Sequence, residues 1–222
     1  SGVLRWLRMY RGYGFTLHEA GALVQSSDSA QVSEALKPGI ERLKEKIAFL
    51  TRIEQNLEQF IAEMESAPAR RDRIVLDVRP ALYRISFEYR DCLSFKKYSL
   101  AYLEHWHKQV PLVKSTPLFH CEDVLKGEYL LDTGLGIFEK DLFDRGILNE
   151  NVQYYPEQPC YRAVLYSSSG EGDRNIRTLL SAMERNGHEL AGDIMTRPVA
   201  LWQENGQPCY YHEFFAPYRK KP

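Results

Sequence analysis

The chain has 222 residues, in which 29 lysines and arginines nearly balance 30 aspartates and glutamates. This balance gives no global reason to bind nucleic acid or an anionic membrane, and no run approaches the ~20 apolar residues of a membrane span. The length is sufficient for one or two domains with a proper core. Four cysteines, none in a C-x-x-C pair, argue against a zinc or thioredoxin-like site. We therefore expect no metal and no cofactor, and a reduced cytoplasmic setting is the simplest interpretation.

The first residues predict short helices. A helix is expected over 3–12 with arginines on one side, and Thr16 then caps a second helix with Glu19 three residues on, as in a capping box. A third short helix over about 29–37 is expected to end before Pro38, which suits the first turn of a following helix.

A long amphipathic helix is predicted over 39–66. Its apolar residues recur three or four apart and form one narrow stripe: Ile40, Leu43, Ile47, Leu50, Ile53, Leu57, Ile61 and Met64. A stripe this narrow needs a partner helix, and the nearest source is a second copy of the chain, which predicts a dimerisation coiled coil. The alternative is a helix that lies across its own domain.

A basic linker over 67–71 is expected to separate this helix from a second domain over 72–222. Strand and helix patterns in that domain are read in order as follows: strands at 72–79 and 82–89, a helix at 93–108, strands at 116–122, 128–138 and 160–167, a helix at 172–186, and a hairpin of 193–202 with 208–217. The order strand, helix, hairpin occurs twice, introduced by P-A-L-Y-R and by P-C-Y-R. We therefore predict an α+β fold in which a duplicated β-α-β-β unit forms one antiparallel sheet, with both helices on one face and a groove on the other.

The N-terminal segment resembles the MerR family of transcription regulators. The matching residues lie directly ahead of the long helix: Leu4, Leu7, Arg11, Gly14, Phe15, Leu17, Glu19 and Ala20. The resemblance implies that 1–38 are the remnant of a MerR-like N-terminal helical region, followed by an antiparallel dimerisation coiled coil. Since the family's winged helix-turn-helix would precede these residues and no initiator Met is present, we expect a fragment of a longer protein, in which promoter DNA is bound only through the missing domain.

Behind this motif, residues 72–218 resemble the GyrI-like effector-binding domain of drug-sensing regulators. The resemblance implies a groove lined by aromatic rings with an acidic group at its base, which takes flat apolar or cationic ligands. The candidate wall residues are Tyr89, Phe138, Tyr155, Tyr166, Met195, Trp202, Tyr210 and Phe214. The alternative for each is an ordinary place in the core.

The acidic position departs from the family's pattern. Thr196 stands where the carboxylate would align, which weakens the expectation of a cationic ligand. Glu213 matches a second acidic position of these domains, and Glu88 is another inward candidate. Arg197 would instead suit a neutral or acidic ligand, and each of these residues could equally be a paired surface group.

These features favour a binding protein over an enzyme: the dimeric, effector-sensing part of a MerR-like regulator that binds a small aromatic or amphipathic molecule. Two alternatives remain open at the level of sequence. One is a GyrI-like hydrolase of reactive small molecules that uses Glu213 with Tyr210 or Tyr166 in acid–base chemistry. The other is a protein-binding module without a small ligand.

Overall fold

The computed structural model describes all residues except 1, 90–91, 94–97, 167–171, 205–206 and 222; the side chains of 89, 92–93, 172, 202, 204 and 207–209 are likewise outside the description. The described chain forms two compact units, Ser1–Gln55 and Asn56–Pro222. The division falls inside one long helix, so this helix contributes to both units. No helix of the described part is both long and apolar enough to cross a membrane.

The first unit is helical. Helix α1 spans Gly2–Gly12 and α2 spans Leu17–Gln25. The predicted capping box is confirmed, because the Glu19 N–H donates to Thr16 Oγ1 at 3.2 Å while the Thr16 N–H donates to Glu19 Oε2 at 2.6 Å. A small core forms between these helices and the following one, from Tyr10, Phe15, Ala20 and Leu23.

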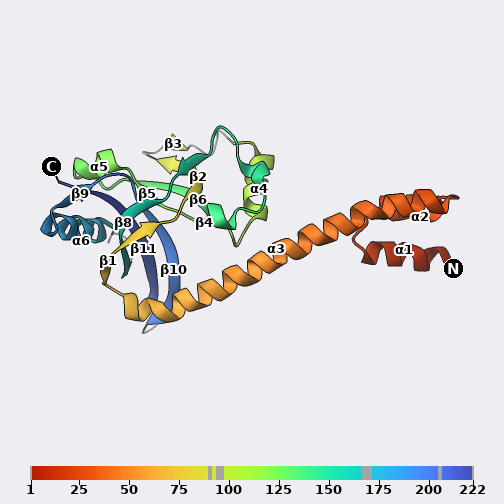
Figure 1. The fold of residues 1–222 in the computed structure, drawn as a ribbon, viewed down its shortest axis with the longest axis horizontal. Coiled ribbons are helices and arrows are strands. Elements are labelled where there is room, and N and C mark those ends of the chain that lie inside the picture. Colours follow the sequence, from red (N-terminus) through yellow and green to blue (C-terminus); the bar gives the residue numbers. More distant parts are fainter. Residues whose placement is uncertain (1, 90–91, 94–97, 167–171, 205–206, 222) are drawn as a thin grey trace. The chain divides into compact units, whose positions relative to one another are not determined.

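Helix α3 runs without interruption over Ser29–Arg70 (Figure 1). The expectations of a separate short helix over 29–37 and of a linker over 67–71 were therefore wrong. Proline in a helix interior normally costs a hydrogen bond, so the sequence pattern favours a helix that starts at Pro38. Tertiary packing overrides this preference at Pro38, since the adjacent Gly39 is buried against the Phe15 ring. Packing also keeps the expected linker helical, since Ala67 is fully buried in the second unit.

The second unit is a mixed structure in which the strands form one antiparallel network. Its elements are β1 Ile74–Arg79, β2 Leu82–Tyr89, β3 Cys92–Leu93, α4 Leu100–Lys108, β4 Lys114–Ser115, β5 Leu118–Phe119, α5 Cys121–Leu125, β6 Leu131–Phe138, η2 Glu139–Asp141, η3 Arg145–Ile147, β7 Gln153–Tyr155, β8 Gln158–Tyr166, α6 Gly172–Arg185, β9 His188–Leu190, β10 Ile194–Glu204 and β11 Gln207–Lys220. The 11-stranded sheet has the order β1-β8-β11-β10-β5-β6-β2-β3, with β4, β7 and β9 at its margins. The predicted α+β class is confirmed.

One predicted strand, over 116–122, was wrong. This segment contains the two-residue strand β5 and then enters helix α5 at Cys121. The Cys121 N–H donates to Asp193 Oδ1 at 2.9 Å, so a carboxylate distant in sequence accepts a hydrogen bond at the start of this helix. A side chain 72 residues away cannot be read from a local pattern.

The two faces of the central strands are packed differently. On one face α6 covers the sheet, where Ile176 and Leu179 form a core with Phe214 of β11. Side chains alternate along a strand, so Glu213 points to the other face. There the last turns of α3 cover the sheet, and Ala67 packs with Val164 and Tyr211.

The contact between Gly39 and Phe15 gives a test of the first unit. A Cβ added at Gly39 would lie 2.5 Å from Phe15 Cζ, so we expect Gly39→Ala to lower the free energy of unfolding of this unit by about 1–3 kcal/mol through overpacking. Urea unfolding followed by hydrogen exchange of the α1 and α2 amides would measure it. The control is Gly21→Ala in α2, where an added Cβ meets no atom of the described residues within 4 Å and where the better helix propensity should add up to ~1 kcal/mol. Equal effects of the two variants would contradict the packing argument.

Candidate functional site

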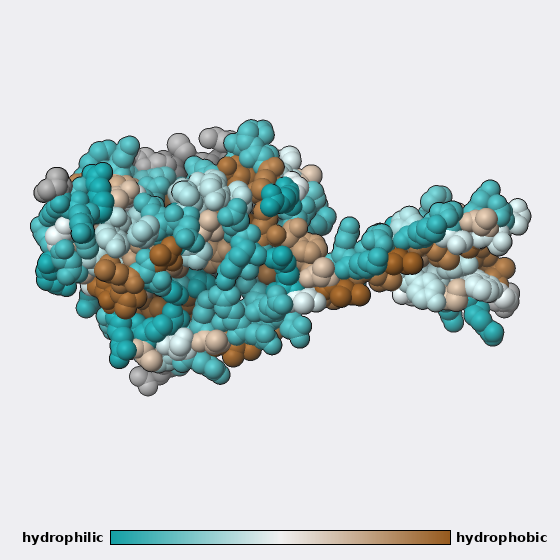
Figure 2. Space-filling model, in the orientation of Figure 1, coloured by the Kyte–Doolittle hydropathy of each residue, from teal (hydrophilic) through white to brown (hydrophobic). Residues whose placement is uncertain are grey.

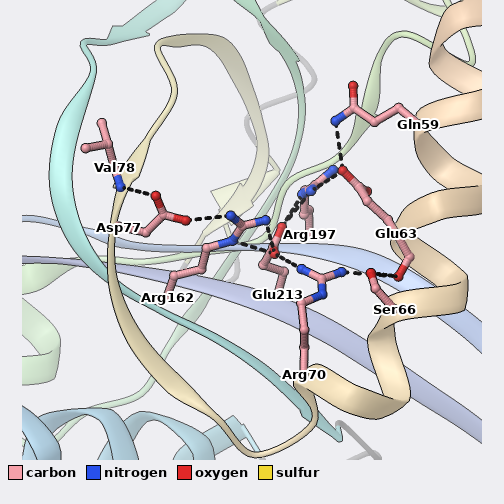
Figure 3. A network of polar contacts seen from close by, with 9 residues as sticks. All are labelled: Gln59, Glu63, Ser66, Arg70, Asp77, Val78, Arg162, Arg197 and Glu213. Carbon is pink, nitrogen blue, oxygen red and sulfur yellow. Dashed lines mark hydrogen bonds and ion pairs between the residues drawn. The ribbon is translucent and has the colours of Figure 1, made fainter.

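The centre of the covered sheet face is the carboxylate of Glu213, whose side chain is fully buried. Oε1 accepts hydrogen bonds from Arg70 Nη1 at 3.1 Å and from Arg162 Nε at 2.7 Å, while Oε2 accepts from Arg197 Nε at 2.8 Å (Figure 3). Three guanidinium groups thus converge on one carboxylate. Such a buried charge is tolerated only when it is paired and hydrogen-bonded, as it is here.

Strand register explains why three of these groups meet. Arg197 of β10 is the direct partner of Glu213 in β11, and Val164 of β8 pairs with Glu213 from the other side. Directly paired residues share a face, and Arg162 lies on that face two positions from Val164. Asp77 of β1 extends the row, because its Oδ2 accepts from Arg162 Nη1 at 2.6 Å.

Helix α3 supplies the remaining members. Glu63 and Arg70 lie seven residues apart, two helical turns, and therefore on one side of the helix. Glu63 Oε1 accepts from Arg197 Nη2 at 2.9 Å and from Gln59 Nε2 at 2.8 Å, and its backbone carbonyl accepts from Arg70 Nη2 at 3.1 Å. The end of α3 is thus bonded to both Arg197 and Glu213 of the sheet (Figure 3).

Electrostatics in this network are balanced, with three arginines against the carboxylates of Glu63, Asp77 and Glu213. Burial acts to lower the pKa of Arg197, but the charge of Glu213 and the bond to Glu63 outweigh it and raise that pKa above its ordinary value. Burial likewise acts to raise the pKa of Glu63, and the Arg197 bond overcomes it and lowers the pKa. Arg197 and Glu63 are therefore charged at neutral pH.

The predicted wall residues do not form one group. Met195 packs with Leu82 and Leu118, beside Phe138 and Tyr155, in an apolar cluster on the same face as Arg197. Burial raises the pKa of Tyr155 to about 12, so its phenol stays protonated at neutral pH.

Other candidates lie elsewhere. Tyr166 is half-buried beside Tyr211, with ring centroids 5.7 Å apart. Phe214 was wrongly placed with Glu213, because as a strand neighbour it faces α6 on the opposite side. Tyr210 is 44% exposed, and Glu88 is also exposed, so neither points into an enclosed site. The predictions for Tyr89 and Trp202 fall on side chains outside the described part of the chain.

Sequence reasoning found Arg197 and Glu213 but missed Glu63, Arg70 and Arg162. Arg70 was read as part of a basic linker, and Arg162 as an ordinary strand residue. Periodicity could have found the helix pair, since Glu63, Ala67 and Arg70 recur at helical spacing beyond the stripe. No local sequence pattern could predict which strand this side of the helix contacts.

A second buried polar cluster lies on β2 and β6. Arg84 donates to Asp132 Oδ1 at 2.8 Å and to Oδ2 at 3.1 Å, and Ser86 Oγ donates to Oδ1 at 2.6 Å. His120 Nε2 lies 3.1 Å from Asp132 Oδ2. Burial acts to raise the pKa of Asp132, but its bonds with His120 and Arg84 lower it to about 2. The bond to Asp132 raises the pKa of His120.

Comparisons with known proteins give little further guidance. No family model and no curated protein matches the chain. The similar solved structures include the crystal structure of the EcmrR C-terminal domain, with a TM-score of 0.47 and 16% identity, covering 67% of this chain and 98% of that chain. They also include the cryo-EM structure of an EcmrR–DNA complex in EcmrR-RPo, with a TM-score of 0.46 and 18% identity, covering 98% of this chain and 82% of that chain. Similarities this low carry no argument about function.

Removing the central carboxylate tests the network. We expect Glu213→Gln, which keeps the shape of the side chain, to lower the free energy of unfolding by about 3–5 kcal/mol, because the buried guanidinium groups lose their shared counter-charge. Urea unfolding would measure it. The control is Glu189→Gln, which removes an ion pair to the exposed Arg219 and should cost about 0–1 kcal/mol. A similar small cost for both variants would contradict the role of Glu213.

The His120–Asp132 pair predicts a pH dependence. Because the folded pKa of His120 is raised, its contribution to stability is complete below the unfolded value and is lost as the pH rises through the folded pKa. The free energy of unfolding should therefore fall as the pH rises above the ordinary histidine pKa of about 6.5, and His120→Gln should flatten this dependence. The pKa of Asp132 is instead lowered to about 2, so its contribution is complete above the unfolded value and disappears as the pH falls toward that number. A His120→Gln variant with an unchanged profile would contradict the assignment.

Proposed function

We propose that this chain is the dimerisation and effector-sensing part of a MerR-like transcription regulator, with a GyrI-like ligand domain. One observation carries the proposal: α3 presents an exposed apolar stripe along one side, while residues on another side of its last turns are bonded to the buried Glu213 site. A single helix that joins a self-association surface to a polar site is suited to relay binding between them.

The stripe supports association with a second copy. Seven of its eight predicted members are exposed, among them Ile47 at 64% and Leu57 at 54%, and Ile53 is half-buried. Hydrophobic surface follows α3 in Figure 2. Exposed apolar rows of this length are costly in water and are typically covered by a partner. The MerR-like motif over 4–20 supports the family context of such a dimer.

The Glu213 network supports the sensing role. Glu63 and Arg70 belong to α3, whereas Arg197 and Glu213 belong to the sheet. A ligand that competes for any of these bonds would change how the end of α3 is held. Its binding would therefore favour one state of the helix, as effector control of a two-state dimer requires.

The hydrolase alternative is less well supported by this geometry. A general base needs a carboxylate oxygen free to accept a proton from water, but both oxygens of Glu213 accept from guanidinium groups. Tyr210 is largely exposed and Tyr166 packs on Tyr211. The protein-binding alternative would be favoured if the chain bound no small molecule.

Charge placed in the stripe tests the dimer. We expect the wild-type chain to have the mass of a dimer by light scattering, and Leu43→Glu with Ile47→Glu to give a monomer, because the new carboxylates would be buried unpaired in an apolar seam. The control, Glu41→Lys with Glu45→Lys, has the same spacing on the opposite side of the helix and should remain dimeric. A monomeric wild-type chain would contradict the proposal.

A further inference from the structure

The charges around Glu213 bear on the class of ligand. A cationic ligand needs a carboxylate oxygen that is free to receive it. Oε1 already accepts from Arg70 and Arg162, and Oε2 from Arg197. Glu213 therefore acts as the internal counter-ion of the chain's own arginines, and a cation would have to displace them from a fully buried position.

Positive charge, in contrast, is left over beside this network. Lys114 of β4 is half-buried, and its ammonium lies 5.6 Å from the centroid of the Phe60 ring. Burial lowers the pKa of Lys114 and the neighbouring Arg197 lowers it further, while the more distant charges of Glu63 and Asp141 oppose this. Among the described residues no carboxylate lies within ion-pair distance of Lys114. A half-buried cation without a paired anion attracts one.

Glu63 is the carboxylate that lies in the fields of both cations. Its Oε1 is bonded to Arg197 and Gln59, but its Oε2 is buried and has no hydrogen-bond partner among the described residues. A buried acceptor left unsatisfied weakens the hold on Glu63. Because Glu63 is carried by α3, it is also the acidic group of this network that can leave with the helix.

Aromatic rings flank the same two cations. The Arg197 guanidinium lies 5.5 Å from the centroid of the Phe138 ring, and Phe60 lies beside Lys114. Phe138 in turn packs against the cluster of Met195 and Leu82. An aromatic carboxylate fits these groups, since its charge can pair with the Arg197 guanidinium and the Lys114 ammonium and its ring can contact the neighbouring apolar side chains.

We propose that the effector of this domain is an aromatic carboxylate that replaces Glu63 between Arg197 and Lys114. The inference rests on the proposed function, because it names the ligand class of the sensing site. Exchange of one carboxylate for another keeps Arg197 paired, and the incoming group also pairs with Lys114. Glu63, once released, returns to water, and the end of α3 loses its bond to Arg197. The ligand thereby favours the state in which this end of the helix is less tightly held.

The test uses three probes that share a ring and differ in charge: 2-naphthoate, 2-naphthol and 2-naphthylmethylammonium. Isothermal titration calorimetry of the full chain should give an affinity for 2-naphthoate at least tenfold above that of the other two. Hydrogen exchange in saturating 2-naphthoate should show faster exchange of amides over 60–70, the end of α3, while amides of α6 stay protected.

Two substitutions distinguish the proposed carboxylate site from a site for a cationic ligand. Glu63→Gln removes the internal competitor and should tighten 2-naphthoate binding several-fold, whereas a cation site would lose affinity. Lys114→Met should weaken 2-naphthoate binding at least tenfold. The control is Lys108→Met, which removes an exposed ammonium paired with Glu104 and should leave the affinity unchanged.

The outcomes distinguish the inference from the proposed function. Preferred binding of 2-naphthylmethylammonium, or weaker 2-naphthoate binding by Glu63→Gln, would overturn the anionic class and leave the sensor proposal standing. No binding of any probe by a dimeric wild-type chain would overturn both the ligand class and the sensing role. Tight 2-naphthoate binding unaffected by Lys114→Met would overturn the assigned position.

Discussion

One buried ion network holds the end of α3 against the sheet. Glu213 and Arg197 would each be a costly charge if buried alone, but with the half-buried Arg70 and Arg162 they satisfy one another. The network joins β1, β8, β10 and β11 to the helix, so strand pairing and helix docking depend on the same carboxylate. Because two of its members belong to α3, any competitor for these bonds acts on the helix as well as on the sheet.

Helix α3 carries two different rows of side chains, one polar row that is bonded to the sheet and one apolar row that is exposed. Ala67 and Arg70 turn toward the sheet, whereas Leu57 and Ile61 are exposed. A helix repeats every 3.6 residues, so both rows run along it without competing for positions. The apolar row suits packing against another apolar surface, and the polar row suits a fixed contact, since hydrogen bonds demand geometry.

The sheet separates packing from charge in a similar way. Alternation along β8 and β11 sends Phe214 and Ala163 to the α6 side and Glu213 and Arg162 to the α3 side. The apolar face needs only volume and is filled by α6. The other face mixes the apolar cluster around Met195 with two ion networks, so its contents are chemically specific. That contrast is the reason we propose a binding role for this face.

Sequence by itself determined the features that depend on near neighbours: the capping box at Thr16, strand β2, helix α6, the final hairpin and the apolar stripe of α3, all set by periodicity, caps and turns. It also singled out Arg197 and Glu213, but not their partners. Tertiary structure alone decided that α3 continues through Pro38 and 67–70, and that Glu63, Arg70 and Arg162 meet Glu213. The reason is physical: ion pairs join residues up to 143 positions apart, and packing against Phe15 or the sheet outweighs the local preferences by which a sequence is read.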